Sequence, residues 1–246
     1  GTSQLITGSQ VSTFYDLTLE TANTIKTQTL DANVNHQLAL NDCELATGDN
    51  KMTVQNPVSS AVSRGIGFVS STSTGRLIRA ANSTSTYLFP TGWNNNGTVY
   101  YRPVEISPSA NDAQTFAVRM AYGDPSSEGY DVNTKAGNVI DVNTKFFHLI
   151  KQTGSTSAAD LSIYYDQNAD GVFGSIGRWQ RVPQWQDLMN TTFSSGSPLT
   201  RRTKSAWTDS GDEPHALINA KPIDVFFNFP NVFAPNGSDP TNQTFH

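Results

Sequence analysis

Oxygen-bearing side chains alternate along one short segment of the chain, Asp166-Gln-Asn168-Ala-Asp170-Gly171. Calcium takes about six to eight oxygen ligands, and a calcium loop supplies the first of them from alternating positions before a glycine that permits a sharp turn. Asp166, Asn168 and Asp170 are therefore candidate ligands of a structural Ca²⁺ ion. The position at which such a loop carries a bidentate glutamate is Gly177. A polar turn between two strands would use the same residue types, so both interpretations stay open.

Side chains suited to hydrolysis are few and scattered along the sequence. Glu128 and Asp124 could act as a general acid and base, although a turn linking two strands explains their segment better. The histidines do not stand at a spacing typical of metal ligands; they are His36, His148, His215 and His246. The sequence also lacks a nucleophile elbow, a phosphate-cradling loop and a dinucleotide fingerprint. We therefore expect a protein that is not an enzyme and has no resident cofactor other than the candidate calcium.

Aromatic side chains offer a different route to ligand binding, because a flat apolar ring with a polar edge can stack on a sugar. Trp179 and Trp185 bracket a short segment and are the pair that we single out as candidate ligand-binding residues. Further rings that could join a sugar-binding platform are Trp93, Trp207, Tyr100, Tyr101, Tyr164 and Tyr165. The alternative is that these rings pack in the core or across strands, as most aromatic side chains of a β-sandwich do.

Composition limits the classes of function. Charged residues make up 15% of the chain, and the net charge is −5, whereas a typical domain has about 25% charged residues. The densest run of cations is Arg201-Arg202-Thr203-Lys204, too short to form an electrostatic surface for nucleic acid. Cys43 is the only cysteine, which excludes an intrachain disulfide. The first residues carry no signal-peptide pattern, as expected of a mature chain or of a piece of a longer one.

Apolar residues on every second position predict strands throughout the chain. Residues 1–95 contain short alternating runs separated by Asn, Gly and Asp, which favours a short β-solenoid; a small sheet is the alternative. Residues 96–190 contain longer, aromatic-rich runs typical of an antiparallel β-sandwich. Residues 191–222 are rich in Ser, Thr and Gly and are expected to form an irregular excursion with few strands. Residues 223–246 are expected to hold a closing strand, over 223–229, and a turn-rich tail.

The tail carries a recognisable pattern, Pro-Asn-Val-Phe-Ala-Pro-Asn-Gly followed by a phenylalanine. It resembles the opening of the type B C-terminal sorting domain of type IX secretion cargo, which is also called the gliding motility-associated C-terminal domain. The matching positions are Pro230, Asn231, Val232, Phe233, Pro235, Asn236, Gly237, Asn242 and Phe245. Ala234 replaces the usual threonine, and Ser238-Asp239-Pro240 replaces the usual Asp-Gly run. Turn chemistry alone would also place Pro, Asn and Gly together.

The N-terminal part is similar to the same secreted cargo. The matching positions are Phe14, Leu17, Leu19, Leu38, Leu40, Thr47, Gly48, Asn50, Met52, Val54, Asn56 and Pro57. The resemblance implies export by the type IX outer-membrane translocon, with its shuttle or anchor proteins as partners. It also implies an extracellular or cell-surface location, anchored at the outer membrane of a Gram-negative bacterium.

We therefore expect a non-catalytic, adhesin-like surface protein that acts in adhesion or gliding. Its partners would be surface glycans or copies of itself, and not nucleic acid. One alternative is a self-assembling surface filament, in which the strand over 223–229 completes the sheet of a neighbour. Another is a carbohydrate-binding module of an exported polysaccharide degrader.

Overall fold

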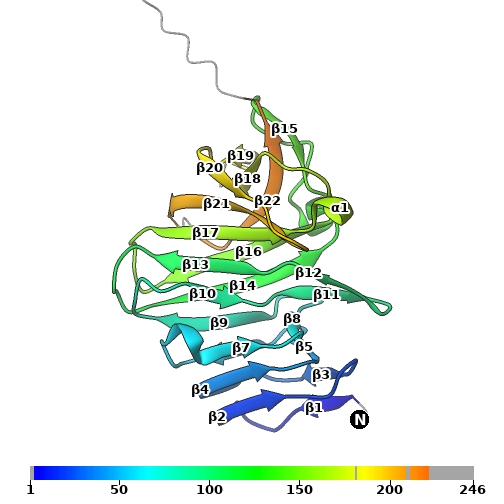
Figure 1. Ribbon diagram of the computed structural model, residues 1–246, viewed down its shortest axis with the longest axis vertical. Helices are drawn as coiled ribbons and strands as arrows, with labels where there is room; N and C mark the ends of the chain where they lie inside the picture. Colours follow the sequence, from blue (N-terminus) through cyan, green and yellow to red (C-terminus); the bar gives the residue numbers. More distant parts are fainter. Residues whose placement is uncertain (1–2, 181, 209–210, 222–246) are drawn as a thin grey trace, which may run out of the picture.

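The computed structural model describes residues 3–180, 182–208 and 211–221, and almost all of its regular structure is β-strand (Figure 1). The predicted all-β class, solenoid-like at the N-terminal end and antiparallel beyond it, is confirmed. Short helical turns interrupt the strands; they are η1 (Ser59–Ala61), η2 (Pro125–Glu128) and α1 (Gln167–Asp170). Over these described ranges, no helix has the length and apolar character needed to span a membrane.

Two ladders of parallel strands form the N-terminal end. One ladder contains, in order, β1 (Gln4–Ile6), β3 (Ile25–Gln28), β5 (Glu44–Ala46) and β8 (Phe68–Ser70). The other contains β2 (Ser12–Leu19), β4 (Ala32–Leu40), β6 (Lys51–Val54) and β7 (Val62–Arg64), with β6 and β7 both paired to β4. The chain alternates between the ladders, so each coil lies on the one before it in a β-solenoid-like stack. The parallel pairing rules out a small antiparallel sheet here.

Alternation of apolar and polar residues explains the solenoid coils. In β4 the side chains of Val34, Leu38 and Leu40 are fully buried, and in the next coil Val54 of β6 lies over Val34 while Val62 of β7 lies over Leu38. At Gly67 the coils approach each other so closely that there is no space for a side chain. A Cβ atom added at Gly67 would lie 2.7 Å from the carbonyl oxygens of both Cys43 and Leu40.

The second ladder continues into an 11-stranded sheet in the order β19-β18-β22-β16-β14-β9-β6-β4-β2. Pairing changes from parallel to antiparallel between β9 and β14. The strands added to this sheet are β9 (Arg76–Ala81), β14 (Gln114–Tyr122), β15 (Val139–Val142), β16 (Phe146–Thr153), β18 (Ser175–Trp179), β19 (Trp185–Asp187) and β22 (Glu213–Ala220). Solenoid and antiparallel parts therefore share one sheet.

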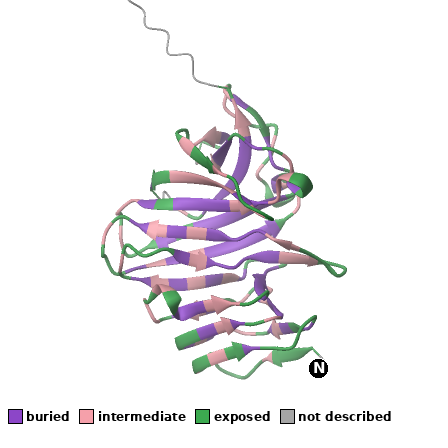
Figure 2. Ribbon diagram, viewed as in Figure 1, coloured by how far each residue is buried: buried purple, intermediate pink, exposed green. Residues whose placement is uncertain are grey.

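A second antiparallel sheet has the order β10-β13-β17-β21-β20. Its strands are β10 (Tyr87–Phe89), β13 (Val104–Pro108), β17 (Ala159–Tyr165), β20 (Thr191–Ser194) and β21 (Thr200–Trp207). A separate hairpin joins β11 (Gly92–Asn95) to β12 (Thr98–Tyr101). One core cluster extends from Leu19 through Leu77 and Phe116 to Leu217, and thus connects residues of the expected 1–95 and 96–190 segments. Buried stretches alternate with half-buried and exposed ones along the strands of both segments (Figure 2).

The prediction that residues 191–222 form an irregular excursion is wrong. Most of the described part of this segment is strand, namely β20, β21 and β22. Thr200 and Trp207 are buried at the two ends of β21, while the residues between them stay half-buried or exposed. Serine and threonine suit a strand with an exposed face, so their abundance does not indicate a loop. The closing strand and tail expected over 223–246 lie outside the described residues.

Candidate functional site

The three candidate calcium ligands lie together at α1, but two of them have protein partners. Asp166 is the N-cap of α1, and its carboxylate accepts hydrogen bonds from the backbone amides of Asn168, at 2.9 Å, and Ala169. Asp170 is buried and forms a bidentate ion pair with Arg102: Nε lies 2.5 Å from Oδ2 and Nη2 lies 2.9 Å from Oδ1. Asn168 is exposed. A cation bound at all three residues would have to displace the guanidinium of Arg102 from Asp170.

The contacts of Asp170 are those of a structural anchor. Oδ2 of Asp170 also accepts a hydrogen bond from the backbone amide of Asp166, at 2.9 Å. Across the part of the chain that the structure describes, no group of three or more His, Cys, Asp or Glu side chains gathers as metal ligands would. The carboxylate of Asp170 thus fixes both the start of α1 and the position of Arg102.

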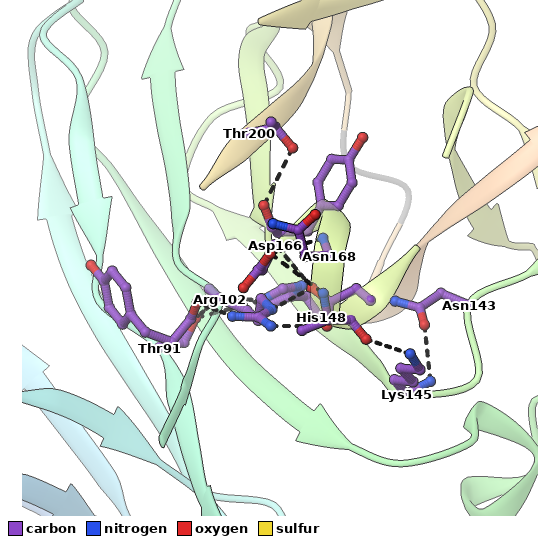
Figure 3. Close-up of polar contacts among 12 residues, drawn as sticks. Thr91, Arg102, Asn143, Lys145, His148, Asp166, Asn168 and Thr200 are labelled. Atoms are coloured by element: carbon purple, nitrogen blue, oxygen red, sulfur yellow. Dashed lines mark hydrogen bonds and ion pairs between the residues drawn. The ribbon is translucent and has the colours of Figure 1, made fainter. Parts of the chain in front are cut away.

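A buried polar network extends from Arg102 to the facing strands (Figure 3). The carbonyl oxygen of Arg102 accepts hydrogen bonds from Thr91 Oγ1, at 2.8 Å, and from His148 Nε2, at 2.9 Å. Complete burial lowers the pKa of His148 to about 4, against the opposing effect of its hydrogen bond to that carbonyl. His148 is therefore neutral at pH 7, with the proton on Nε2. It serves to hold β16 against the segment that joins β12 to β13.

His215 has a similar structural role on β22. Trp207 Nε1 donates to His215 Nε2 at 3.0 Å, and His215 Nδ1 donates to the carbonyl oxygen of Glu213 at 3.0 Å. Burial, together with the nearby positive charge of Arg178, lowers the pKa of His215 to about 3. The structure places this ring in the core, where it is fully buried. His36 is exposed and stacks on Tyr15, and His246 lies outside the described residues.

The carboxylate pair considered for acid–base chemistry also has structural partners. Asp124 caps η2 by accepting a hydrogen bond from the backbone amide of Ser126, at 2.8 Å. Glu128 forms an ion pair with Arg119, whose side chain is only 5% exposed. The turn interpretation of this segment therefore agrees with the contacts that the two side chains make.

The structure brings Trp179 and Trp185 together, but not as an exposed platform. Their ring centroids are 5.8 Å apart and their planes meet at 70°. Trp185 is fully buried, and its Nε1 donates to the carbonyl oxygen of Tyr130 at 3.3 Å. Trp179 is half-buried and packs edge-on against Tyr130. The two tryptophans belong to a second, smaller core cluster, in which Phe147 and Ile218 are also buried.

A different aromatic cluster is accessible from solvent and was not singled out as a unit by the sequence. It consists of Trp93 on β11, Tyr100 on β12 and Tyr122 at the end of β14. The rings of Trp93 and Tyr122 are parallel, within 1°, with centroids 5.8 Å apart, and Tyr100 lies 5.0 Å from Tyr122. Tyr122 is 36% exposed, and the other two rings are half-buried. We call these three residues the aromatic cluster.

A tight turn positions the aromatic cluster. Asn96 and Gly97 both have positive φ, 49° and 93°, as a two-residue hairpin turn requires. In the hairpin register, Trp93 lies directly opposite Tyr100. The hairpin extends beyond the neighbouring strands at one side of the molecule (Figure 1). The Asn96-Gly97 pair is the sequence signal of a tight hairpin turn, and it could have predicted that Trp93 lies beside Tyr100. The sequence near the hairpin holds no signal for the contact with Tyr122, which comes from β14.

We found no matching family, no matching curated protein and no matching solved structure for this chain.

Proposed function

We propose that this chain is a non-catalytic surface protein, adhesin-like in action, that binds glycans through the aromatic cluster. The observation that carries the proposal is the packing of Trp93 and Tyr100, on a projecting hairpin, against Tyr122 at the end of β14. Tryptophan and tyrosine rings combine a flat apolar face with a polar edge, which matches the apolar face and hydroxyl rim of a sugar ring. The tight turn and the strand pairing fix two of the three rings before any ligand arrives, which lowers the entropic cost of binding.

The roles of the candidate catalytic groups support a binding function. Asp124 and Asp166 cap short helices, Glu128 and Asp170 hold guanidinium groups, and the imidazole of His148 is enclosed in the core. Each of these side chains therefore stabilises the fold at the place where it lies. The proposal that the chain is not an enzyme rests on these assignments.

A glycan array tests the proposed binding surface. We expect bound glycans for the wild-type chain and loss of binding on Trp93→Ala or Tyr122→Ala. Trp179→Ala is the matched control, because it removes a half-buried aromatic ring on β18, outside the aromatic cluster, and should leave binding unchanged. Binding that survives both substitutions in the aromatic cluster would refute the proposal. Selective binding of soluble polysaccharides, rather than cell-surface glycans, would favour the carbohydrate-binding module of a polysaccharide degrader.

Export by the type IX route is a further part of the proposal and rests on the resemblance of the tail. Its matching positions, from Pro230 to Phe245, lie outside the described residues. The test is to express the chain behind a signal peptide in a bacterium with an intact translocon and in a strain that lacks it. We expect surface display in the first strain and periplasmic accumulation in the second. Equal distribution in the two strains would disprove this route.

A further inference from the structure

We propose that a hollow beside the hairpin binds a Ca²⁺ ion through the carboxylates of Asp42 and Glu44. The hollow has a volume of about 170 Å³, and its lining comes from turns of the solenoid and from the hairpin of β11 and β12. Asp42 and Glu44 belong to one solenoid coil, and Asn94 and Gly97 belong to the hairpin. None of these residues is part of the segment at α1 that the sequence suggested for calcium.

The local fold brings the two carboxylates to one hollow and covers them with the hairpin. Cys43 is buried in the core cluster, whereas Asp42 and Glu44, on either side of it, both line the hollow. Glu44 begins β5, and its partner in β8 is Phe68. The hairpin packs against that partner, since a Cβ atom added at Gly92 would lie 2.9 Å from the ring of Phe68. Figure 1 shows β11 beside β8. The carboxylates therefore lie between a solenoid coil and the hairpin.

Each of the two carboxylates has a buried oxygen atom without a partner. No donor of the described residues lies within hydrogen-bond reach of Glu44 Oε2 or Asp42 Oδ1. Glu44 is only 9% exposed, and its other oxygen, Oε1, accepts a hydrogen bond from Ser70 Oγ at 2.5 Å. Within the described ranges, no Lys, Arg or His forms an ion pair with either carboxylate. Burying a charge without a partner is costly, and a bound cation would compensate both anions.

The oxygen atoms around the hollow suit calcium. Ca²⁺ takes about six to eight oxygen ligands in a flexible geometry, from carboxylates, carbonyl and amide groups and water. Besides the two carboxylates, Asn23, Thr24 and Asn94 line the hollow. Asn94 Oδ1 accepts a hydrogen bond from the amide of Gly97 at 2.8 Å and keeps a second lone pair. Mg²⁺ demands a nearly ideal octahedron, which ligands from separate turns and strands are less suited to provide.

The thiol of Cys43 does not redirect the site toward a softer metal. Cys43 also borders the hollow, but its side chain is buried in the core cluster. Burial raises the pKa of this thiol, and the charge of Asp42 raises it further, so the thiol stays protonated at pH 7. A thiolate, and not a thiol, is the form that binds metal ions. The available ligands are therefore oxygen atoms, which hard cations prefer.

Calorimetric titration of the chelator-treated chain with Ca²⁺, and separately with Mg²⁺, tests the site directly. We expect one Ca²⁺ site, and a loss of affinity of at least about tenfold for Asp42→Asn or Glu44→Gln, since even an indirect partner of a metal ion typically contributes about 10–100-fold. Glu20→Gln is the matched control, because Glu20 is an exposed carboxylate nearby that accepts a hydrogen bond from Asn41.

Three outcomes would overturn the proposal. One is the absence of Ca²⁺ binding to the wild-type chain, and another is tighter binding of Mg²⁺ than of Ca²⁺. The third is an equal loss of affinity for Glu20→Gln and Glu44→Gln, which would indicate a diffuse effect of charge. Asp166→Asn should bind like the wild type, and loss of binding in that variant alone would assign the ion to α1 instead. Because Ca²⁺ itself is the probe, the result does not depend on glycan binding.

Thermal unfolding in the presence of Ca²⁺ and of a chelator separates binding from a structural role of Glu44. An ion that binds only the folded chain raises the midpoint of unfolding, so we expect a rise with Ca²⁺ for the wild-type chain and for Glu20→Gln. Glu44→Gln, which can still accept the hydrogen bond from Ser70, should show no rise. If Glu44 were only structural, its substitution would change the midpoint equally in both conditions and leave the rise intact, and that result would refute the site.

Discussion

Replacing Asp170 by Asn would remove the negative charge from a buried ion pair and leave the size of the side chain nearly unchanged. The side chains of Arg102 and Asp170 are 5% and 2% exposed, so water cannot replace the lost carboxylate. Removing one partner of a buried pair costs about 3–5 kcal/mol, because the remaining charge is left without compensation. The bidentate geometry and the third hydrogen bond, from the amide of Asp166, place this pair in that range.

The assay is urea unfolding of Asp170→Asn and wild-type chain, followed by tryptophan fluorescence and circular dichroism at pH 7. A loss of about 3–5 kcal/mol is a large part of the roughly 5–15 kcal/mol that stabilises a typical domain. Asp166→Asn is the matched control, since asparagine is also a good N-cap and should cost only a few tenths of a kcal/mol. A loss below about 1 kcal/mol for Asp170→Asn would refute the reasoning, since it would mean that Arg102 finds other compensation.

The other predictions follow from burial and close packing. The free energy of unfolding should fall as pH decreases from about 6.5 to about 4. In this range the histidines of the unfolded chain take up protons, whereas His148 and His215 of the folded chain stay neutral, because burial lowers their pKa values to about 4 and about 3. The slope is at most about 1.4 kcal/mol per pH unit for each histidine. Thermal unfolding curves at pH 7 and pH 5 measure it, and a shallower dependence is expected for His148→Phe; an unchanged slope would contradict this assignment. In the Glu44→Gln chain, a chelator should leave the midpoint of thermal unfolding unchanged if Arg102 is the partner of Asp170. A drop of several degrees would instead show that a cation bound away from Glu44 stabilises the chain. Gly67→Ala should destabilise the chain by about 1–3 kcal/mol through overpacking, while Gly137→Ala, which meets open space, should not; equal denaturation midpoints would argue against tight coil contact.

Sequence periodicity was sufficient to predict the solenoid, because its signal is local. Leu38 and Leu40 stand on either side of Ala39, and Met52 and Val54 on either side of Thr53, so the large apolar residues occupy every second position and predict which side of the strand is buried. The same reasoning failed over 191–222, where polar composition was interpreted as irregular structure. In that segment Trp207 is buried at the end of a strand, and its burial depends on neighbouring strands that local composition does not reveal.

The candidate site was harder to predict because its contacts are distant along the chain. Arg102 and Asp170 are 68 positions apart, and the spacing of oxygen atoms around Asp170 does not reveal a guanidinium partner. Trp93 and Tyr122 meet only because the hairpin returns toward the end of β14. Composition likewise could not distinguish the buried Trp185 from an exposed ring. Local patterns indicate strands and turns, whereas the identity of a facing side chain requires the assembled sheets.

The core that joins coils to antiparallel strands gives the molecule a gradient of local stability. Near β14 each strand has neighbours on both sides, whereas among the described strands β2 pairs with β4 alone. Fraying should therefore begin at the amino-terminal rung and advance toward the centre, one rung at a time. Amide protons of β2 should exchange with deuterium fastest and those of β14 slowest. The strands around β14 would then stay folded while the first coil, which consists of β1 and β2, unfolds locally, and the coil can refold against them.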